Sequence, residues 1–207
     1  MNKFKSKRFL IILLSPSGGG KSSIANRILA DSDNIDYSIS YTTRPARGKE
    51  VNGIDYNFIS DEEFDELLQR NEFLEYAEVH GYMYGTSRKF IEDILESGHH
   101  AILDIDVQGA LQIIEKGVDV VTVFILPPSE KVLVERLKKR KTDSQKVIEI
   151  RLKNSRDEID YLDLNKFQYL VVNDNFEVAV QDVKQIISAE EKKLDRIIEI
   201  KKTFYGG

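Results

Sequence analysis

Short runs of apolar residues alternate along the chain with segments whose apolar residues recur at helical spacing. The apolar runs cover residues 9–14, 101–105, 120–126 and 169–172. Helical spacing follows them over residues 21–30, from about residues 108 and 129, and over residues 176–201. Continuous apolar runs bounded by helices are typical of strands that are buried on both faces of a parallel sheet. The pattern therefore predicts an α/β fold in which helices flank a parallel sheet of four strands, with room for a fifth.

Two segments interrupt this alternation. Residues 39–98 lie between the first two of these strands and are rich in Tyr, Thr, Glu and turn residues, which predicts an inserted mixed α/β subdomain. The second segment is residues 132–156, in which the stretch 136–156 holds nine basic residues and only two acidic ones. This excess predicts a basic helical lid, although a solvated helix face would carry similar charge. We expect the core domain to consist of residues 1–38, 99–131 and 157–207.

The composition is that of an ordinary globular protein. With 207 residues, of which 41% are hydrophobic and 31% charged, the chain can fill one large core with small subdomains attached. No apolar run approaches the roughly 20 residues of a membrane helix, and the first run is too short for a secretory signal. The absence of cysteine excludes disulfides and cysteine nucleophiles and fits a reducing compartment. The net charge of −5 argues against bulk nucleic-acid binding, so we expect a cytoplasmic protein that binds neither membranes nor nucleic acid.

A glycine-rich loop follows the first strand and leads directly into the first helix. Its residues are Ser15, Pro16, Ser17, Gly18, Gly19, Gly20, Lys21, Ser22 and Ser23. Glycines let successive backbone N–H groups point into one concavity at the positive end of the helix, where phosphate oxygens bind. Lys21 adds a positive charge for the β and γ phosphates of ATP, and the Ser22 hydroxyl is the expected ligand of Mg²⁺. The loop therefore predicts a P-loop NTPase sheet with an ATP site.

The first position of the motif G-x-x-x-x-G-K-[ST] is Ser15 instead of glycine. A glycine at that position allows an unusual backbone angle. We therefore expect Ser15 either to adopt that angle or to bend the entry to the loop slightly.

A GTPase would need two further motifs, D-x-x-G and N-K-x-D. Residues 106–109 match the first motif, whereas residues 165–168 end in Gln168. An acid is required at that last position because it accepts two donors from the guanine edge. A GTPase is therefore disfavoured, and the match at residues 106–109 is weak on its own.

The insertion collects side chains that suit a guanine nucleotide. Arg44 and Arg47 can bind phosphate oxygens bidentately, and the hydroxyls of Tyr56 and Tyr84 can join them. Glu75 suits guanine because N1–H and N2–H₂ form two adjacent donors, a pair that adenine lacks. These side chains favour guanosine monophosphate as the phosphoryl acceptor.

In these residues the chain resembles the guanylate kinase family. The signature is carried by Thr43, Arg44, Arg47, Glu50, Gly53, Tyr56 and Phe58, and the resemblance extends from the phosphate loop through residues 103–106 and 127–129 to 172–174. It implies that the base is read by Ser40, Glu75, Thr86 and Asp104. It implies that the GMP phosphate is held by Arg44, Arg47, Tyr56 and Tyr84, with Glu50 in the same GMP site. The implied lid arginines are Arg140 and Arg151, and the implied ATP site also includes Arg136 and Asn173.

The resemblance implies transfer of a phosphoryl group from MgATP to GMP or dGMP in purine nucleotide metabolism. The charge of the transferring group would be neutralised by Lys21, Arg44, Arg140 and Arg151, and Mg²⁺ would be held by Ser22 and Asp104. Two alternatives stay open. A kinase for another nucleoside monophosphate is the first, and a guanylate-kinase-like interaction module without catalysis is the second, although the intact phosphate loop argues against it. We expect a monomer or a homodimer.

Overall fold

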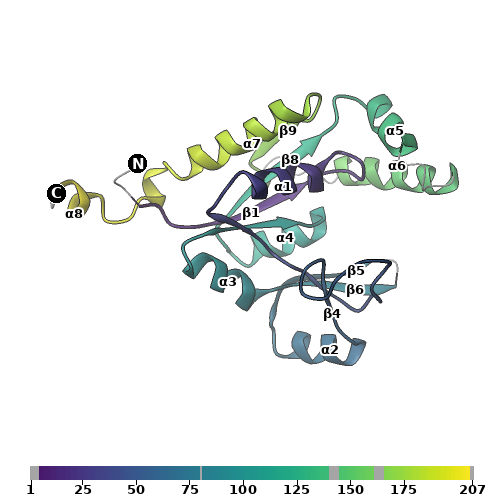
Figure 1. The fold of residues 1–207 in the computed structure, drawn as a ribbon, viewed down its shortest axis with the longest axis horizontal. Helices are drawn as coiled ribbons and strands as arrows, with labels where there is room; N and C mark the ends of the chain where they lie inside the picture. Colours follow the sequence, from purple (N-terminus) through teal and green to yellow (C-terminus); the bar gives the residue numbers. More distant parts are fainter. Residues whose placement is uncertain (1–4, 80, 140–144, 161–165, 206–207) are drawn as a thin grey trace.

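A five-stranded parallel sheet forms the centre of the molecule. The structure is a computed structural model that describes residues 5–79, 81–139, 145–160 and 166–205 (Figure 1). The sheet has the strand order β2-β7-β1-β8-β9. Its strands are β1 (Leu10–Leu14), β2 (Ile35–Tyr37), β7 (His100–Asp104), β8 (Val120–Leu126) and β9 (Tyr169–Val172). The four predicted strands are confirmed, and β2 is the fifth.

Helices cover both faces of this sheet, as predicted. The helices α1 (Lys21–Ala30) and α7 (Phe176–Glu190) lie on one face, and α3 (Arg88–Glu96) and α4 (Val107–Glu115) lie on the other (Figure 1). Alternate residues of β1 serve the two faces, since Ile11 packs with α1 and α7 whereas Ile12 packs with α3 and α4. Each buried aliphatic side chain contributes about 1.5–3 kcal/mol. The continuous apolar runs are therefore explained by burial on both faces.

The insertion forms a second, mixed sheet with the strand order β4-β3-β6-β5. Its strands are β3 (Tyr41–Thr42), β4 (Asn57–Phe58), β5 (Phe73–Val79) and β6 (Tyr82–Ser87). Helix α2 (Asp61–Gln69) begins with a capping box in which Ser60 and Glu63 satisfy each other's backbone N–H groups. Phe64 of this helix stacks on Phe73 with ring centroids 4.5 Å apart. This small core fixes β5, the strand that carries Glu75.

Two further helices form a layer beside the sheet, α5 (Glu130–Lys139) and α6 (Gln145–Asp160). They pack through the buried side chains of Leu133, Leu137 and Ile148. The predicted lid boundary at residue 156 falls within α6. Arg140, one of the two predicted lid arginines, lies outside the described residues.

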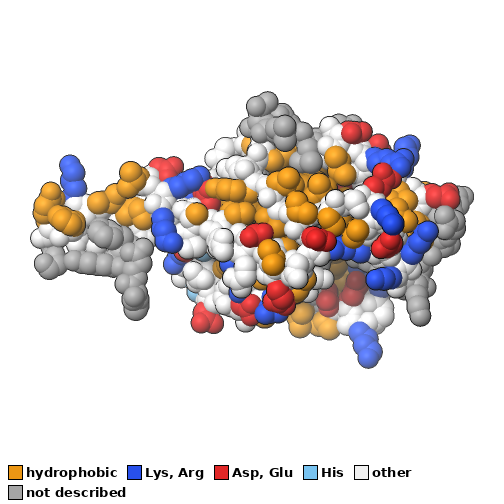
Figure 2. Space-filling view, turned by 90° about the horizontal axis from the view of Figure 1, so that it is seen from above, with side chains coloured by type: hydrophobic (Ala, Val, Ile, Leu, Met, Phe, Trp, Pro, Cys, Tyr) orange, Lys and Arg blue, Asp and Glu red, His pale blue; other side chains and the backbone are white. Residues whose placement is uncertain are grey.

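The prediction of one terminal helix over residues 176–201 was wrong beyond Glu190. The chain instead forms a short 3₁₀ helix η1 (Leu194–Arg196) and then α8 (Ile200–Tyr205), which extends away from the body (Figures 1 and 2). Arg196 is buried, pairs with Glu190 and Asp119, and lies over the Phe9 ring. Its backbone oxygen also accepts a hydrogen bond from Lys7. These contacts stabilise a bend because a continuing helix would carry Arg196 away from them.

None of the helices within the described parts of the chain is both long and apolar enough to cross a bilayer.

Candidate active site

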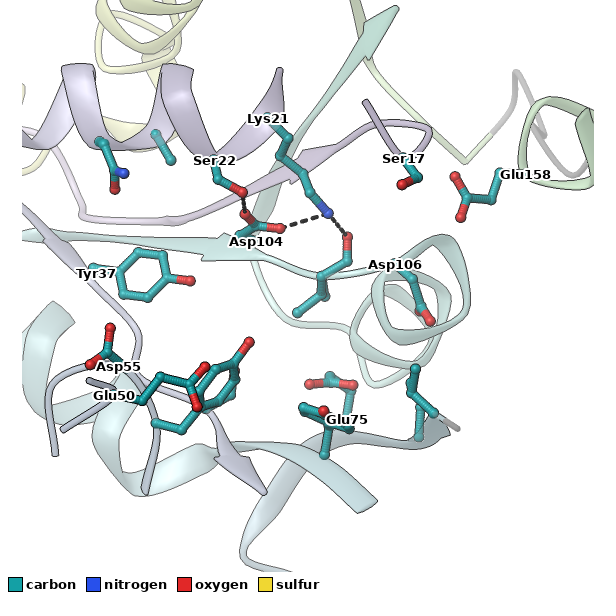
Figure 3. A pocket seen from close by; sticks show the side chains of 18 of the residues that line it. Ser17, Lys21, Ser22, Tyr37, Glu50, Asp55, Glu75, Asp104, Asp106 and Glu158 are labelled. Atoms are coloured by element: carbon teal, nitrogen blue, oxygen red, sulfur yellow. Dashed lines mark hydrogen bonds and ion pairs between the residues drawn. The ribbon is translucent and has the colours of Figure 1, made fainter. Parts of the chain in front are cut away.

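A cleft of about 1040 Å³ lies between the phosphate loop, the inserted sheet and helix α6 (Figure 3). The predicted site residues that line it are Ser17, Lys21, Ser22, Ser40, Glu50, Tyr56, Glu75, Tyr84, Asp104 and Arg151. They come from the first helix, the insertion, the end of β7 and the predicted lid. The fold thus brings residues more than 130 positions apart in the sequence to one cavity.

The phosphate loop needs its glycines for two different reasons. Gly18 and Gly20 have φ angles of 96° and 100°, in the left-handed region that side chains disfavour. A Cβ atom at Gly20 would also lie 2.3 Å from Nδ2 of Asn173. Gly20 occupies the N-cap of α1, so the loop delivers its backbone N–H groups to the positive end of that helix.

Ser15 is accommodated without an unusual backbone angle. Among the described residues, positive φ angles outside glycine occur at Asn71 and Glu199 and not at Ser15. The Ser15 hydroxyl donates to the backbone oxygen of Pro16 at 2.9 Å. A Cβ atom at Gly19 would lie 1.9 Å from this hydroxyl, so the Ser15 side chain occupies space that glycine leaves open.

Asp104 joins the two functional residues at the start of α1. Its Oδ1 lies 2.6 Å from Nζ of Lys21, and its Oδ2 accepts a hydrogen bond of 2.6 Å from the Ser22 hydroxyl. Lys21 also donates to the backbone oxygen of Ile105 at 2.9 Å (Figure 3). Both oxygens of Asp104 therefore face α1, which favours its predicted metal role over its predicted base-reading role.

Glu75 is a buried carboxylate on the opposite wall of the cleft (Figure 3). The residue is 5% exposed, and the Thr86 hydroxyl donates to its Oε1 at 2.5 Å. Burial raises the pKa of Glu75 to about 7, and the hydrogen bond from Thr86 partly opposes this shift. Asp106 raises the pKa further by charge repulsion, whereas Lys116 lowers it. Glu75 and Thr86, two of the residues expected to read the base, are thus in direct contact.

Arg44 is held by the side chains predicted to share its site. It forms two hydrogen bonds of 2.9 Å with the Glu50 carboxylate, and its Nε donates to the Tyr84 hydroxyl at 3.1 Å. The guanidinium lies over the rings of Tyr56 and Phe58. Its hydrogen bonds with Glu50 raise the pKa of Arg44 and lower the pKa of Glu50. Arg44 therefore stays positively charged in a fixed plane.

Arg47 lies at the surface, and its backbone N–H donates to Glu50 at 2.7 Å. Ser40 lines the cleft directly before β3. Two of the predicted GMP residues thus act as anchors, since Glu50 contacts Arg44 and Arg47, and Glu75 contacts Thr86. Asp104, also predicted in the GMP site, lies instead at α1.

Arg151 of α6 contacts the phosphate loop directly, whereas Arg136 of α5 reaches it through Asn173. Arg151 of α6 donates to the Ser17 hydroxyl at 3.0 Å. Arg136 of α5 donates to the backbone oxygen of Asn173 at 2.7 Å, and Asn173 donates in turn to the backbone oxygen of Gly19 at 2.8 Å. Asn173 is buried, and its Oδ1 has no hydrogen-bond partner among the described residues. Asn173, predicted at the ATP site, thus also stabilises the phosphate loop through its hydrogen bond to Gly19.

Several cleft residues escaped the sequence analysis. They are Asn26, Tyr37, Asp55, Asn154 and Glu158, and the cleft is also lined by Asp106, which the sequence analysis named only within the match at residues 106–109. Burial raises the pKa of Tyr37 and that of Glu158, and the charge of Lys21 lowers the latter. A signal was present for α6, because Arg151, Asn154 and Glu158 follow helical spacing and share one face. Tyr37 carried no comparable signal, since its position depends on how β2 joins the sheet.

The chemistry around Asp104 fits a magnesium ion. Mg²⁺ prefers oxygen ligands and is usually held by one or two carboxylates together with substrate phosphates and water. Asp104 and Ser22 offer a carboxylate and a hydroxyl in contact with each other at the cleft. Over the described ranges, no group of three or more His, Cys, Asp or Glu side chains is arranged to hold a metal ion. A site completed by substrate phosphates therefore suits these residues.

Comparisons with known proteins point to one family. A family model described as guanylate kinase matches residues 7–190. The guanylate kinase of Rickettsia prowazekii (strain Madrid E) is 43% identical over 191 residues, which are 92% of this chain and 96% of the relative. The guanylate kinase of Thermotoga maritima is 44% identical over 187 residues, which are 90% of this chain and 89% of the relative. A crystal structure of guanylate kinase from Anaplasma phagocytophilum matches with a TM-score of 0.77 and 34% identity, covering 99% of this chain and 97% of that one.

Proposed function

Because the chain belongs to the guanylate kinase family and transfers a phosphoryl group from ATP to GMP, we propose that its cleft holds both nucleotides at once. The observation that carries this proposal is that Lys21, Ser22 and Glu75 line the same cavity. Its volume of about 1040 Å³ reaches the upper end of the roughly 300–1,000 Å³ of small-molecule sites. The cavity therefore has room for a donor and an acceptor that react directly.

ATP binds at the phosphate loop in this proposal. The loop N–H groups and the charge of Lys21 hold the β and γ phosphates, and Lys21 exchanges its contact with Asp104 for phosphate oxygens. Ser22 and Asp104 would hold Mg²⁺, which would help to neutralise the charge that develops on the phosphates. Arg151 lies 3.0 Å from Ser17 of the loop and is placed to contact the transferring group. We assign Arg136 and Asn173 to the support of this half of the site.

GMP binds on the opposite wall. Glu75 accepts the two adjacent donors of guanine, and Thr86 keeps one carboxylate oxygen in place. The GMP phosphate is held by Arg44, Arg47, Tyr56 and Tyr84. Four of the five N–H groups of Arg44 already have partners, so this residue acts mainly as an oriented charge and Arg47 adds donors from the surface.

Phosphoryl transfer needs alignment and charge neutralisation more than covalent help. We propose that residues 39–98 form the GMP-binding unit, that residues 132–156 form the lid, and that residues 1–38, 99–131 and 157–207 form the core. Closure of the units brings the acceptor phosphate in line with ATP and excludes water, which would otherwise accept the phosphoryl group.

The two alternatives from the sequence, a kinase for another monophosphate and a non-catalytic module, are not favoured by the guanylate kinase relatives. We propose a cytoplasmic location, because a chain without cysteine suits a reducing compartment. A monomer or a homodimer remains our proposal for the assembly, and dGMP our proposal for a second acceptor.

Two variants with matched controls test the residue assignment. We expect Lys21→Ala to lose turnover by about a thousandfold without a change in the thermal unfolding midpoint, because it removes a charge that neutralises the transferring group. We expect Glu75→Gln to raise KM for GMP and to reduce the preference for GMP over AMP. The controls are Lys131→Ala on α5 and Glu78→Gln on β5, both exposed. Wild-type kinetics in the two test variants, measured as ADP formed by chromatography, would refute the assignment.

A further inference from the structure

The segment Asp106–Gly109 begins helix α4, and the proposed roles leave its glycine unexplained. Gly109 is buried in the first turn of α4 and has an ordinary φ angle, so its backbone does not require glycine. A Cβ atom at this position would lie 2.7 Å from Oε2 of Glu75 and 3.2 Å from its Cδ. Glycine is therefore needed here because a side chain would collide with the Glu75 carboxylate, and not because the backbone adopts an unusual conformation.

We propose that Gly109 is a specificity-determining position, because only glycine lets the Glu75 carboxylate lie against α4 in the orientation that reads guanine. The inference rests on the proposed role of Glu75. It adds a residue that contacts Glu75 from a different element, and it gives the match at residues 106–109 a function unrelated to GTPases.

A shift of strand β5 cannot relieve the collision between Glu75 and a Cβ atom at Gly109, because side chains of α4 and its C-cap bind the backbone on both sides of Glu75. The Gln112 side chain accepts from the Tyr76 N–H at 3.2 Å and donates to the Tyr76 oxygen at 2.9 Å. Lys116 donates to the backbone oxygen of Leu74 at 2.7 Å. Gly109, Gln112 and Lys116 follow helical spacing and lie on one face of α4. This face thus fixes β5 and the carboxylate together.

The carboxylate is also confined on its other sides. Thr86, which is fully buried, donates to Oε1 of Glu75 at 2.5 Å. Asp106 accepts a hydrogen bond of 2.8 Å from the Gly109 N–H, which fixes the first turn of α4. An added methyl group at Gly109 can therefore be accommodated only if the Glu75 carboxylate rotates. The fold survives such a rotation, whereas the alignment with two guanine donors does not.

The test is the variant Gly109→Ala, with Gln108→Ala as its control. Gln108 is exposed in the same turn, and alanine favours the helix at both positions. We expect Gly109→Ala to raise KM for GMP by about tenfold or more, the effect of misaligning a hydrogen bond to a charged group. KM for ATP should stay within about twofold, since Lys21 and Ser22 contact Asp104 and not Glu75. Gln108→Ala should match the wild type for both substrates.

A second readout separates a turned carboxylate from a general disturbance. Inosine monophosphate lacks the 2-amino group, so the ratio of kcat/KM for GMP over IMP reports the contact between Glu75 and that group. We expect Gly109→Ala to lower this ratio. We expect Gly109→Ala to change neither the ratio nor KM for GMP when it is combined with Glu75→Ala, because the clashing atoms are then gone.

Each result decides between the alternatives. If Gly109→Ala has the wild-type KM for GMP and the wild-type GMP-to-IMP ratio, the inference is overturned. It is also overturned if Gly109→Ala raises KM and lowers the ratio by the same factors in the Glu75→Ala background, because the effect would then come from a shift of α4 and not from the Glu75 carboxylate. If Glu75→Ala alone leaves the ratio unchanged, the proposed role of Glu75 fails and the inference fails with it. If Gly109→Ala does not fold, recovery of the folded state in the double variant supports the clash, and continued unfolding contradicts it.

Discussion

Lowering the pH from 8 to 6 should weaken the use of GMP, because guanine recognition depends on the charge of Glu75. Burial raises the pKa of this carboxyl to about 7. The charged form accepts the N1–H and N2–H₂ donors, whereas the protonated form presents a donor of its own to the same edge. A raised pKa means that recognition is present above pH 7 and is lost as the pH falls through 7.

The magnitude follows from the ionised fraction. With a pKa of about 7, the charged fraction of Glu75 falls from roughly nine tenths at pH 8 to roughly one tenth at pH 6. The ratio kcat/KM for GMP reports groups of the free enzyme and free substrate, so it should fall by about tenfold over this range. KM for ATP should change less, because Glu75 lies on the opposite wall of the cleft from the phosphate loop (Figure 3).

The assay should measure ADP and GDP directly by chromatography, so that coupling enzymes add no pH dependence. The phosphate of GMP itself titrates near pH 6, and the variant Glu75→Gln controls for this. The variant keeps the size of the side chain and cannot ionise, so the quotient of wild type over variant isolates Glu75. A quotient that is constant between pH 6 and pH 8 would refute the reasoning.

Three further predictions concern the stability effect of Glu75 and the roles of Arg151 and Arg196. Glu75→Gln should raise the free energy of unfolding at pH 8 by up to about 3 kcal/mol, because a buried carboxylate with a raised pKa opposes folding at pH values above its unfolded-state pKa. Denaturant titrations should show that this stability difference between the variant and the wild type shrinks as the pH is lowered towards 5. Arg151→Ala should lower kcat by about a thousandfold in steady-state kinetics, while KM for GMP stays within about twofold of the wild-type value. An unchanged kcat would exclude Arg151 from the transfer step. Arg196→Ala should lower the free energy of unfolding by about 3 kcal/mol, since it removes the partner of Oε2 of the buried Glu190, whose Oε1 keeps its contacts with Lys193 and Tyr169, while kcat/KM for both substrates stays at the wild-type value.

The sequence predicted the parts of the molecule that depend on local order. The parallel strands follow from continuous apolar runs, and the phosphate loop follows from glycines between a strand and a helix. The family resemblance implied that Glu75 and Thr86 both read the base, and the structure places them within hydrogen-bond distance of each other.

What the sequence could not predict depends on contacts between distant elements. The terminal helix ends early because Arg196 finds Glu190, Asp119 and Phe9, which no periodicity reveals. Glu158 reaches the cleft only because α6 folds back over the phosphate loop. The steric role of Gly109 depends on β5 lying against α4. In each case a long-range contact determines the structure, and local propensity does not.

The central claim is that one cleft accepts ATP at Lys21 and guanine at Glu75. The most direct measurement incubates the purified protein with MgATP and, in turn, GMP, AMP, CMP and UMP, and follows both products of each reaction. We predict equal amounts of ADP and GDP with GMP, and turnover with the other three monophosphates at least about a hundredfold lower in kcat/KM, since they lack the donor pair that Glu75 accepts. Equal turnover of AMP and GMP, or ADP formed without GDP, would contradict the account.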